Sequence, residues 1–239
     1  DFLLTPLITL LVTGFLTFVV VGPLARELSD GITNGLSWLY TTAGPVGGFL
    51  FGMVYSPIVV TGLHQSFPAV ELPLIAQMSS GGPGSFIFPI ASMANIAQGA
   101  VTLAVFFLTK DSKMKGLAGA GGVSAIVGIT EPAIFGVNLR LRWPFFIGMG
   151  VASLGGAAVA LLDIHNQALG AAGFVGFVSI VPDDIVKYLI LEVIVFIAAF
   201  GAAFAYGTTR GKASLAGDDV EADEAALEAE AMAEHAETV

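Results

Sequence analysis

The chain has 239 residues, of which 55% are hydrophobic and 12% are charged, and its mean hydropathy is +0.86. This composition excludes an ordinary soluble globular domain and indicates a membrane protein. The net charge of −10 arises at the C-terminal end, because residues 218–239 hold nine acids and no lysine or arginine. Residues 1–212 hold ten acids and nine bases, which indicates no nucleic-acid surface. The absence of cysteine excludes disulfides and thiolate metal sites, and we expect no bound metal.

Residues 2–22 are the first segment long enough to cross a bilayer, which takes about 20 mostly apolar residues. The chain starts at Asp1 without a signal-peptide pattern, so we expect it to be a piece of a longer protein. Residues 23–44 are too polar to span, but their apolar residues recur at helical spacing: Leu28, Ile32, Leu36 and Leu39. This spacing predicts an amphipathic helix at the membrane interface.

Four more segments have the length and apolarity of a membrane span: residues 45–63, 86–109, 143–163 and 185–206. Two others are interrupted, since 64–84 holds three prolines and 115–136 is rich in glycine and is expected to break at Pro132. We predict that both are re-entrant hairpins, because non-helical backbone is tolerated at membrane depth only where protein or water covers it. Residues 168–181 are too short to cross and receive no role.

Basic residues predict the orientation. They follow the third span and the last span: Lys110, Lys113 and Lys115, then Arg210 and Lys212. The positive-inside rule places both groups in the cytoplasm, which requires that residues 115–136 do not cross. The predicted fold is an all-α polytopic membrane protein with about five transmembrane helices, an amphipathic interfacial helix and two re-entrant hairpins that enter from opposite faces.

Glu131 lies in the run GITEP, residues 128–132, among glycines and apolar residues. A carboxylate at bilayer depth costs about 2.5–3.5 kcal/mol, so it usually faces a cavity, a partner or a substrate pathway. The structural alternative is an ion pair with Arg140 or Arg142, although both precede Trp143 and have the character of interfacial residues. We interpret Glu131, with Thr130 beside it, as part of a substrate site.

Other polar residues are candidates for the same site. His64 ends the run YSPIVVTGLH and is followed by Gln65; the alternative is an interfacial histidine. Glu71 fits a ligand contact or a structural carboxylate equally well. Asn95 and Gln98 lie one turn apart, which predicts an amide pair facing the ligand or hydrogen bonds between helices. Carboxylates and amides suit a sugar, whose hydroxyls need donors and acceptors.

Three runs resemble the membrane (C) component of enzyme II of the bacterial phosphoenolpyruvate-dependent sugar phosphotransferase system: YSPIVVTGLHQSFPAVE, GSFIFPIASMANIAQGAVTLAVFF and GITEPAIFGVNLRLRWPF. The similarity is to the glucose superfamily, most closely to its sucrose-specific permeases, and extends over residues 1–206. It implies a homodimer with an elevator-type transport domain. Residues 1–22 would be the last scaffold-side helix, 23–44 a linker helix, 45–206 the transport domain, and 207–239 an acidic cytoplasmic tail or linker.

The resemblance also implies the chemistry. It assigns Glu131 and His64 to the sugar site as catalytic residues, near the hydroxyl that becomes phosphorylated; many relatives have a second histidine where this chain has Gln65. No cofactor is expected, since phosphoenolpyruvate supplies the phosphoryl group through phosphocarrier proteins and a phosphocysteine of a B domain. The implied partners are the B and A domains, a second copy, the sugar and the lipid of the bacterial cytoplasmic (inner) membrane. Without a cysteine, this chain is expected to be inactive by itself.

Two other classes of function remain open. An ion-coupled secondary transporter would use Glu131 as a titrating carrier. A structural membrane subunit would bind no sugar. Within the phosphotransferase class, sucrose is preferred to trehalose or a β-glucoside only because of the similarity of the motifs.

Overall fold

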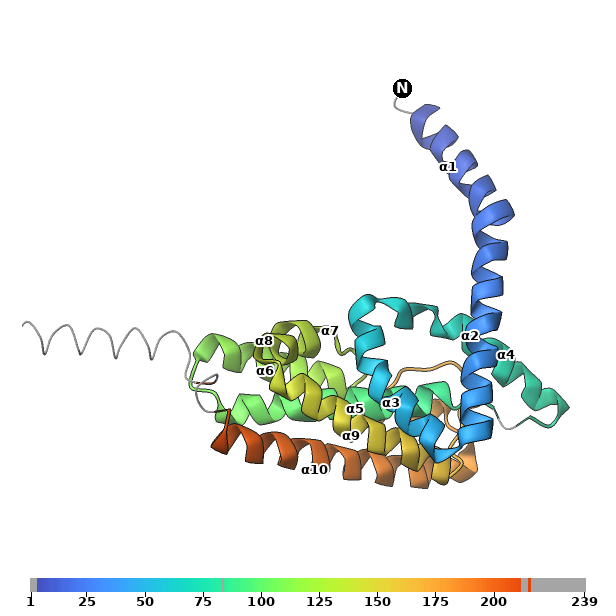
Figure 1. Ribbon diagram of the computed structural model, residues 1–239. Coiled ribbons are helices and arrows are strands. Elements are labelled where there is room, and N and C mark those ends of the chain that lie inside the picture. Colours follow the sequence, from blue (N-terminus) through green and yellow to red (C-terminus); the bar gives the residue numbers. More distant parts are fainter. Residues whose placement is uncertain (1–3, 83, 212–214, 216–239) are drawn as a thin grey trace, which may run out of the picture.

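The computed structural model describes residues 4–82, 84–211 and 215, which form a bundle of helices (Figure 1). No β-strand occurs among these residues, and the extended pairings are two isolated bridges, from Ser85 to Asn166 and from Asn166 to Ile180. Four helical segments are long and apolar enough to cross a membrane: Thr5–Leu24, Ile87–Leu108, Trp143–Leu161 and Pro182–Thr209. The described residues are therefore mostly helical and include several membrane-length helices, as predicted.

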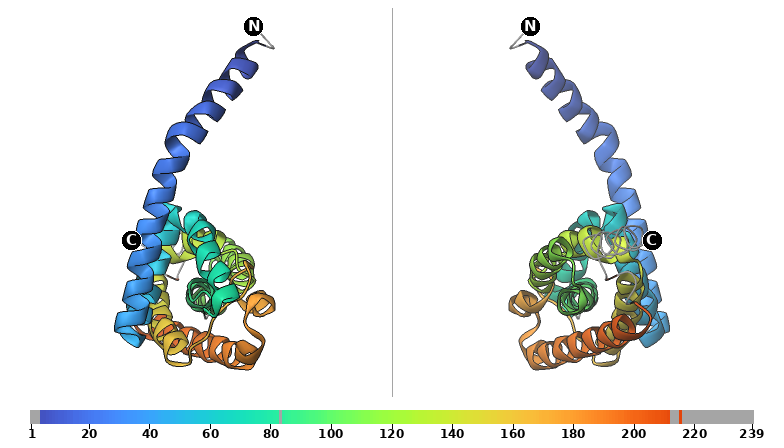
Figure 2. Two further views of the ribbon diagram at one scale, coloured as in Figure 1. Left: turned by 90° about the vertical axis from the view of Figure 1, so that its right-hand side faces the viewer. Right: turned by 90° about the vertical axis from the view of Figure 1, so that its left-hand side faces the viewer.

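A long helical rod forms the N-terminal part. It consists of α1 (Leu4–Leu16), the π-helical η1 (Thr17–Val21) and α2 (Gly22–Ala43). Figure 1 shows α1 leaving the body of the molecule, and Figure 2 shows α2 passing along one flank of the bundle. Because none of Thr5–Leu24 is buried, its apolar side chains are available to lipid or to other helices. The predicted amphipathic stripe consists of Leu28, Ile32, Leu36 and Leu39. These residues belong to α2, but their side chains lie outside the part that the structure describes.

A sharp bend follows the rod. α3 (Pro45–Thr61) ends at Gly62, whose φ of 78° lies in the left-handed region that stops a helix. The segment after it, Leu63–Ser80, lies at 103° to α3 and comprises η2 (Leu63–Ser66), α4 (Phe67–Ala76) and η3 (Gln77–Ser80). α3 counts as a fifth candidate span only together with this bent continuation. The bend lies at Gly62, just before the predicted re-entrant hairpin of residues 64–84, and the place of that segment in a bilayer stays a prediction.

α5 (Ile87–Leu108) is the axis of the bundle, and α3, α6, α9 and α10 pack around it. Its fully buried side chains alternate in size, with Ile90, Met93 and Ile96 beside Ala97 and Ala100. Small residues let the neighbouring backbones approach, and the larger ones fill the remaining volume.

The second predicted hairpin is present as two antiparallel helical pieces. α6 (Ser112–Ile126) is followed by a turn at residues 127–130 and then by α7 (Glu131–Ala133), η4 (Ile134–Asn138) and α8 (Leu139–Leu141). The prediction that Pro132 breaks the helix is wrong. The break precedes it, and Pro132 lies in the first turn of α7, where a missing N–H removes no helical hydrogen bond. The hairpin also extends beyond the predicted residues 115–136.

The last third of the chain returns to regular helices. α9 (Trp143–Leu161) and α10 (Ile185–Thr209) agree with the predicted spans. Between them, residues 162–173 are irregular and lead into two 3-10 helices, η5 (Phe174–Ser179) and η6 (Pro182–Asp184). Segment 168–181, to which the sequence assigned no role, thus packs through η5 on α5 and α10. Most of the predicted acidic tail, residues 216–239, lies outside the described residues.

α3 and α9 touch through their backbones. A Cβ atom at Gly48 would overlap the Gly156 carbonyl, one at Gly156 would overlap the Gly48 carbonyl, and one at Gly52 would overlap the Ala152 carbonyl. On both helices, small residues four positions apart form the contact, which is the close-packing pattern of membrane helices.

We predict that Gly156→Ala destabilises the protein by about 1–3 kcal/mol, because α3 and α9 must separate to admit the methyl group. Gly150→Ala, on the same helix, is the matched control, since nothing lies within 4 Å of a Cβ atom there. Thermal unfolding of the detergent-solubilised protein measures both variants. Equal midpoints for the two would contradict the backbone contact.

Candidate functional site

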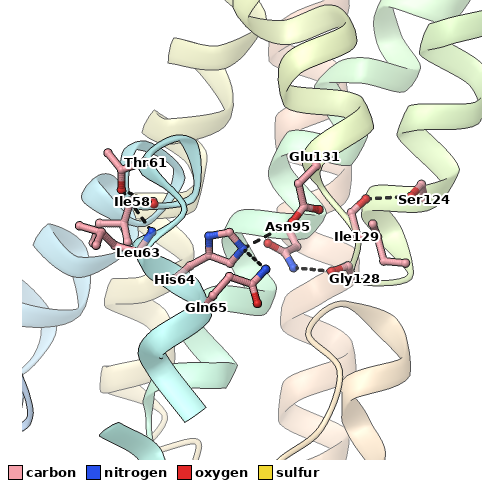
Figure 3. Close-up of polar contacts among 10 residues, drawn as sticks. All are labelled: Ile58, Thr61, Leu63, His64, Gln65, Asn95, Ser124, Gly128, Ile129 and Glu131. Atoms are coloured by element: carbon pink, nitrogen blue, oxygen red, sulfur yellow. Dashed lines mark hydrogen bonds and ion pairs between the residues drawn. The ribbon is translucent and has the colours of Figure 1, made fainter. Parts of the chain in front are cut away.

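A cavity of about 280 Å³ lies where α3, η2, the start of α5, the turn 127–130 and segment 170–172 meet. It is lined by five of the seven residues predicted for the site: His64, Gln65, Asn95, Thr130 and Glu131. They come from three parts of the chain that only the fold brings together, as Figure 3 shows for four of them.

His64 is the centre of the polar contacts in this cavity. Its Nε2 lies 3.4 Å from Oε1 of Glu131 and 3.1 Å from Nε2 of Gln65, so the imidazole joins η2 to α7 (Figure 3). The His64 side chain is 16% exposed and that of Glu131 is 43% exposed, so the carboxylate opens to the cavity. The ring atom Nδ1 of His64 is buried and has no hydrogen-bond partner among the described residues.

Glu131 therefore pairs with a histidine and not with an arginine. Within the described part of the chain its carboxylate lies 3.4 Å from the His64 imidazole, while Arg140 and Arg142 lie exposed near the end of the hairpin. The structural alternative, an ion pair between Glu131 and Arg140 or Arg142, is thus not present among the described residues.

The turn before Glu131 is fixed by side chains of neighbouring helices. Gly128 has a φ of 109°, and a Cβ atom there would overlap the Ala172 carbonyl oxygen. Asn95 donates its Nδ2 to the Gly128 carbonyl at 3.4 Å, and the Ser124 hydroxyl donates to the Ile129 carbonyl at 2.8 Å (Figure 3). Because these carbonyls have side-chain donors, the turn can leave the helical path inside the bundle.

Segment 170–172 forms a further wall of the cavity, and Gly173 anchors it. The Gly173 N–H donates to the Ser92 hydroxyl at 2.9 Å, and its carbonyl accepts from the Tyr188 hydroxyl at 2.8 Å. Gly173 has a φ of 87°, and a Cβ atom there would overlap the Ile126 carbonyl. Glu192, fully buried one turn beyond Tyr188 on α10, lies beside this hydroxyl.

Sequence reasoning missed this wall and the residues that hold it. Segment 170–172 carries only glycine and alanine, which give no chemical signal. Glu192 did carry one, because a carboxylate in the middle of an apolar span is itself a sign of a polar environment in the core. Glu192 belongs to the last span, far in the sequence from Glu131, so its proximity to the cavity wall could not be predicted from the sequence.

Glu71 does not line the cavity. It is fully buried, and its Oε1 accepts hydrogen bonds from the Ser85 hydroxyl at 2.7 Å, Asn166 Nδ2 at 3.0 Å and the Phe88 N–H at 3.2 Å. This carboxylate joins α4 to the start of α5 and to the loop after α9. The structure thus places Glu71 outside the cavity, in a buried hydrogen-bonded junction.

Gln98 also lies outside the cavity. Its Nε2 donates to the Ser56 hydroxyl at 3.1 Å and to the Phe145 carbonyl at 3.2 Å, and its Oε1 accepts from Asn138 Nδ2 at 2.8 Å. It thus connects α5 to α3, α9 and η4 by hydrogen bonds. Asn95 and Gln98, predicted as an amide pair, therefore lie in different environments. Asn95 lines the cavity, and Gln98 is buried in the core.

Comparison with known proteins places the chain in a family. The family described as "Phosphotransferase system, EIIC" matches residues 1–153, which is more than half of the chain. This chain belongs to the phosphotransferase system EIIC family. No solved structure gives a significant match to it.

This EIIC chain is similar to sucrose-specific components of phosphotransferase systems. It is 56% identical over 181 residues to the EIIBC component of Staphylococcus xylosus, a match that covers 75% of this chain and 38% of the relative. It is 51% identical over 200 residues to that of Vibrio alginolyticus, covering 84% and 42%. It is 50% identical over 206 residues to the EIIBCA component of Pediococcus pentosaceus, covering 86% and 32%. The chain therefore spans less than half the length of the curated relatives it matches.

We predict that Glu71→Leu lowers the free energy of unfolding of the EIIC chain by several kcal/mol, because each buried donor left without an acceptor costs about 1–3 kcal/mol. Glu71→Gln keeps a carbonyl oxygen for the same donors and is expected to be markedly milder. Denaturation of the purified protein in detergent compares the two. If Leu and Gln are equally tolerated, Glu71 does not hold this junction.

Proposed function

We propose that this chain is the sugar-binding membrane part of a sucrose phosphotransferase permease. The observation that carries the proposal is the His64–Glu131 pair, 3.4 Å apart in a cavity that also holds Gln65, Asn95 and Thr130. Family membership and the names of the similar proteins support the same substrate and process.

Sugar recognition would use the mixed polar lining of the cavity. The Glu131 carboxylate accepts from sugar hydroxyls, while the Asn95 and Gln65 amides offer donors and acceptors. Tyr55 and Phe67 supply apolar surface against the C–H faces of the sugar ring. A volume of about 280 Å³ lies near the lower end of small-molecule pockets, which run from about 300 Å³ upward, so a sugar would fill it closely.

The phosphoryl transfer would take place at the same pair. A sugar hydroxyl oxygen attacks the phosphorus of a phosphocysteine on the B domain, the S–P bond breaks, and the cysteine leaves as a thiolate. The proton of that hydroxyl passes to Glu131, which serves as general base. Since His64 Nε2 lies 3.4 Å from Glu131, the imidazole orients the carboxylate and can share the proton.

The transport cycle would follow the arrangement implied by the family. The proposed assembly is a homodimer in the bacterial inner membrane with the C-terminal tail in the cytoplasm. The bent segment after α3 and the α6–α8 hairpin act as re-entrant hairpins of an elevator-type transport domain. B and A domains are the cytoplasmic partners, consistent with the EIIBC and EIIBCA names of the similar proteins.

We predict that Glu131→Gln in the complete parent permease weakens equilibrium binding of labelled sucrose and lowers phosphorylation of bound sucrose about 100-fold or more, the usual contribution of a general base. Asp183→Asn, which changes an exposed carboxylate outside the cavity, is the matched control. Binding to membranes and phosphoenolpyruvate-dependent phosphorylation are measured on the same preparations.

Each other outcome points to a different function or role. Weaker binding with a normal rate of phosphorylation would make Glu131 a ligand and not a base. Binding of trehalose or a β-glucoside in place of sucrose would change the substrate. Uptake that needs no phosphoenolpyruvate and collapses with an uncoupler would indicate an ion-coupled transporter. A wild-type protein that binds no sugar would indicate a structural subunit.

A further inference from the structure

A second cavity, of about 430 Å³, lies at the N-terminal end of α5, between the end of α2 and the turn after α9. Its volume falls within the range of about 300–1,000 Å³ that is usual for small-molecule pockets. The side chains that line it include Tyr40, Gln77, Phe86, Asp163 and His165. They come from segments far apart in the sequence, as do those of the His64–Glu131 cavity.

The polar groups of this second cavity are suited to hydroxyls. The Tyr40 hydroxyl is buried and has no hydrogen-bond partner among the described residues. Burial, with the nearby Asp163 and Asp184, raises the pKa of Tyr40, so this hydroxyl remains a donor at physiological pH. The side chain of Asp163 is 82% exposed, and the residue has a left-handed φ of 55°, which aspartate tolerates better than most residues.

His165 completes the polar side. Its Nδ1 lies 3.0 Å from the Asp163 carbonyl oxygen, which fixes the ring beside the carboxylate. The lining residues therefore offer a carboxylate, an amide, an imidazole and a phenol, but neither lysine nor arginine among the described residues. A neutral polyol can satisfy this mixture because each hydroxyl both donates and accepts. A phosphorylated sugar would meet the negative charge of Asp163, while the basic Lys187 pairs with Asp184 at 2.7 Å.

A row of aromatic rings runs from one cavity to the other. The Tyr40 ring stacks on Phe86 with centroids 3.9 Å apart, Phe86 lies 6.4 Å from Phe51, and Phe51 lies 5.7 Å from Phe67. Phe67 lines the His64–Glu131 cavity, and Phe86 lines the second one. Successive ring contacts thus connect the lining of one cavity to the lining of the other.

The geometry points to an outer saccharide-binding site in the second cavity, which receives the unphosphorylated sugar before it reaches His64 and Glu131. This inference rests on the proposed function. The cavity lies at the end of α5 opposite to Lys110, Lys113 and Lys115, which the positive-inside rule assigns to the cytoplasm. A site at this end meets sugar arriving from outside, and its one lining carboxylate, Asp163, disfavours the phosphorylated product.

The test uses the double variant Tyr40→Phe with Asp163→Asn in the complete parent permease, because it removes one donor and one charge and keeps the aromatic stack. Uptake of labelled sucrose by intact cells presents the sugar from outside. Phosphoenolpyruvate-dependent phosphorylation in inside-out vesicles presents it from the cytoplasmic side. We expect the KM for uptake to rise about tenfold, in line with the loss of a hydrogen bond to a charged group, while the KM in vesicles stays unchanged.

Asp183→Asn is the matched control, since this exposed carboxylate does not line the cavity. An unchanged KM for uptake in the double variant overturns the inference and leaves the cavity to a lipid headgroup or another segment of the permease. An equal rise in both assays also overturns it, because the effect would then lie in the His64–Glu131 cavity or in folding. If the wild type takes up no sucrose, the proposed function fails, and this site fails with it.

Discussion

The hydrogen bonding of two non-helical turns inside an apolar bundle is the constraint on which the cavity depends. Residues 127–130 and 170–173 lie against each other, and the α6 backbone pairs only some of their backbone groups, among them the N–H groups of Gly128 and Ile129. An unpaired backbone group in an apolar environment costs several kcal/mol, so neighbouring helices must supply partners. Ser92 and Asn95 on α5 do so, as does Tyr188 on α10. The walls of the cavity exist because these side chains reach the turns.

The surroundings of each carboxylate, and not its residue type, decide what it does. Glu71 is enclosed by three donors and holds a junction between segments. Glu192 is enclosed by α10 and its neighbours, beside the hydroxyl that anchors the cavity wall. Glu131 follows a turn and precedes a proline, so its side chain opens into space and meets a single histidine. This openness makes Glu131 available to a ligand.

Close packing and chemistry are linked through glycine. Gly48 and Gly156 bring α3 and α9 into backbone contact, and α3 leads directly into His64. Gly128 and Gly173 likewise allow the turns at residues 127–130 and 170–173 to approach each other closely. A Cβ atom at any of these four positions would overlap a backbone carbonyl of the neighbouring segment. The high glycine content of the chain therefore serves the site as well as the bundle.

The sequence by itself determined the membrane-length helices, the presence of a hairpin that contains GITEP, and five residues that share the cavity. Apolar runs, prolines, glycine-rich stretches and an isolated carboxylate are local signals, so one chain suffices to read them. The sequence could not show that Glu131 and Asn95 line the cavity while Glu71 and Gln98 lie outside it. It also assigned no role to segment 170–172. Those distinctions depend on which donors lie nearby in space, and partners up to 95 residues apart, such as Glu71 and Asn166, meet only when the bundle closes.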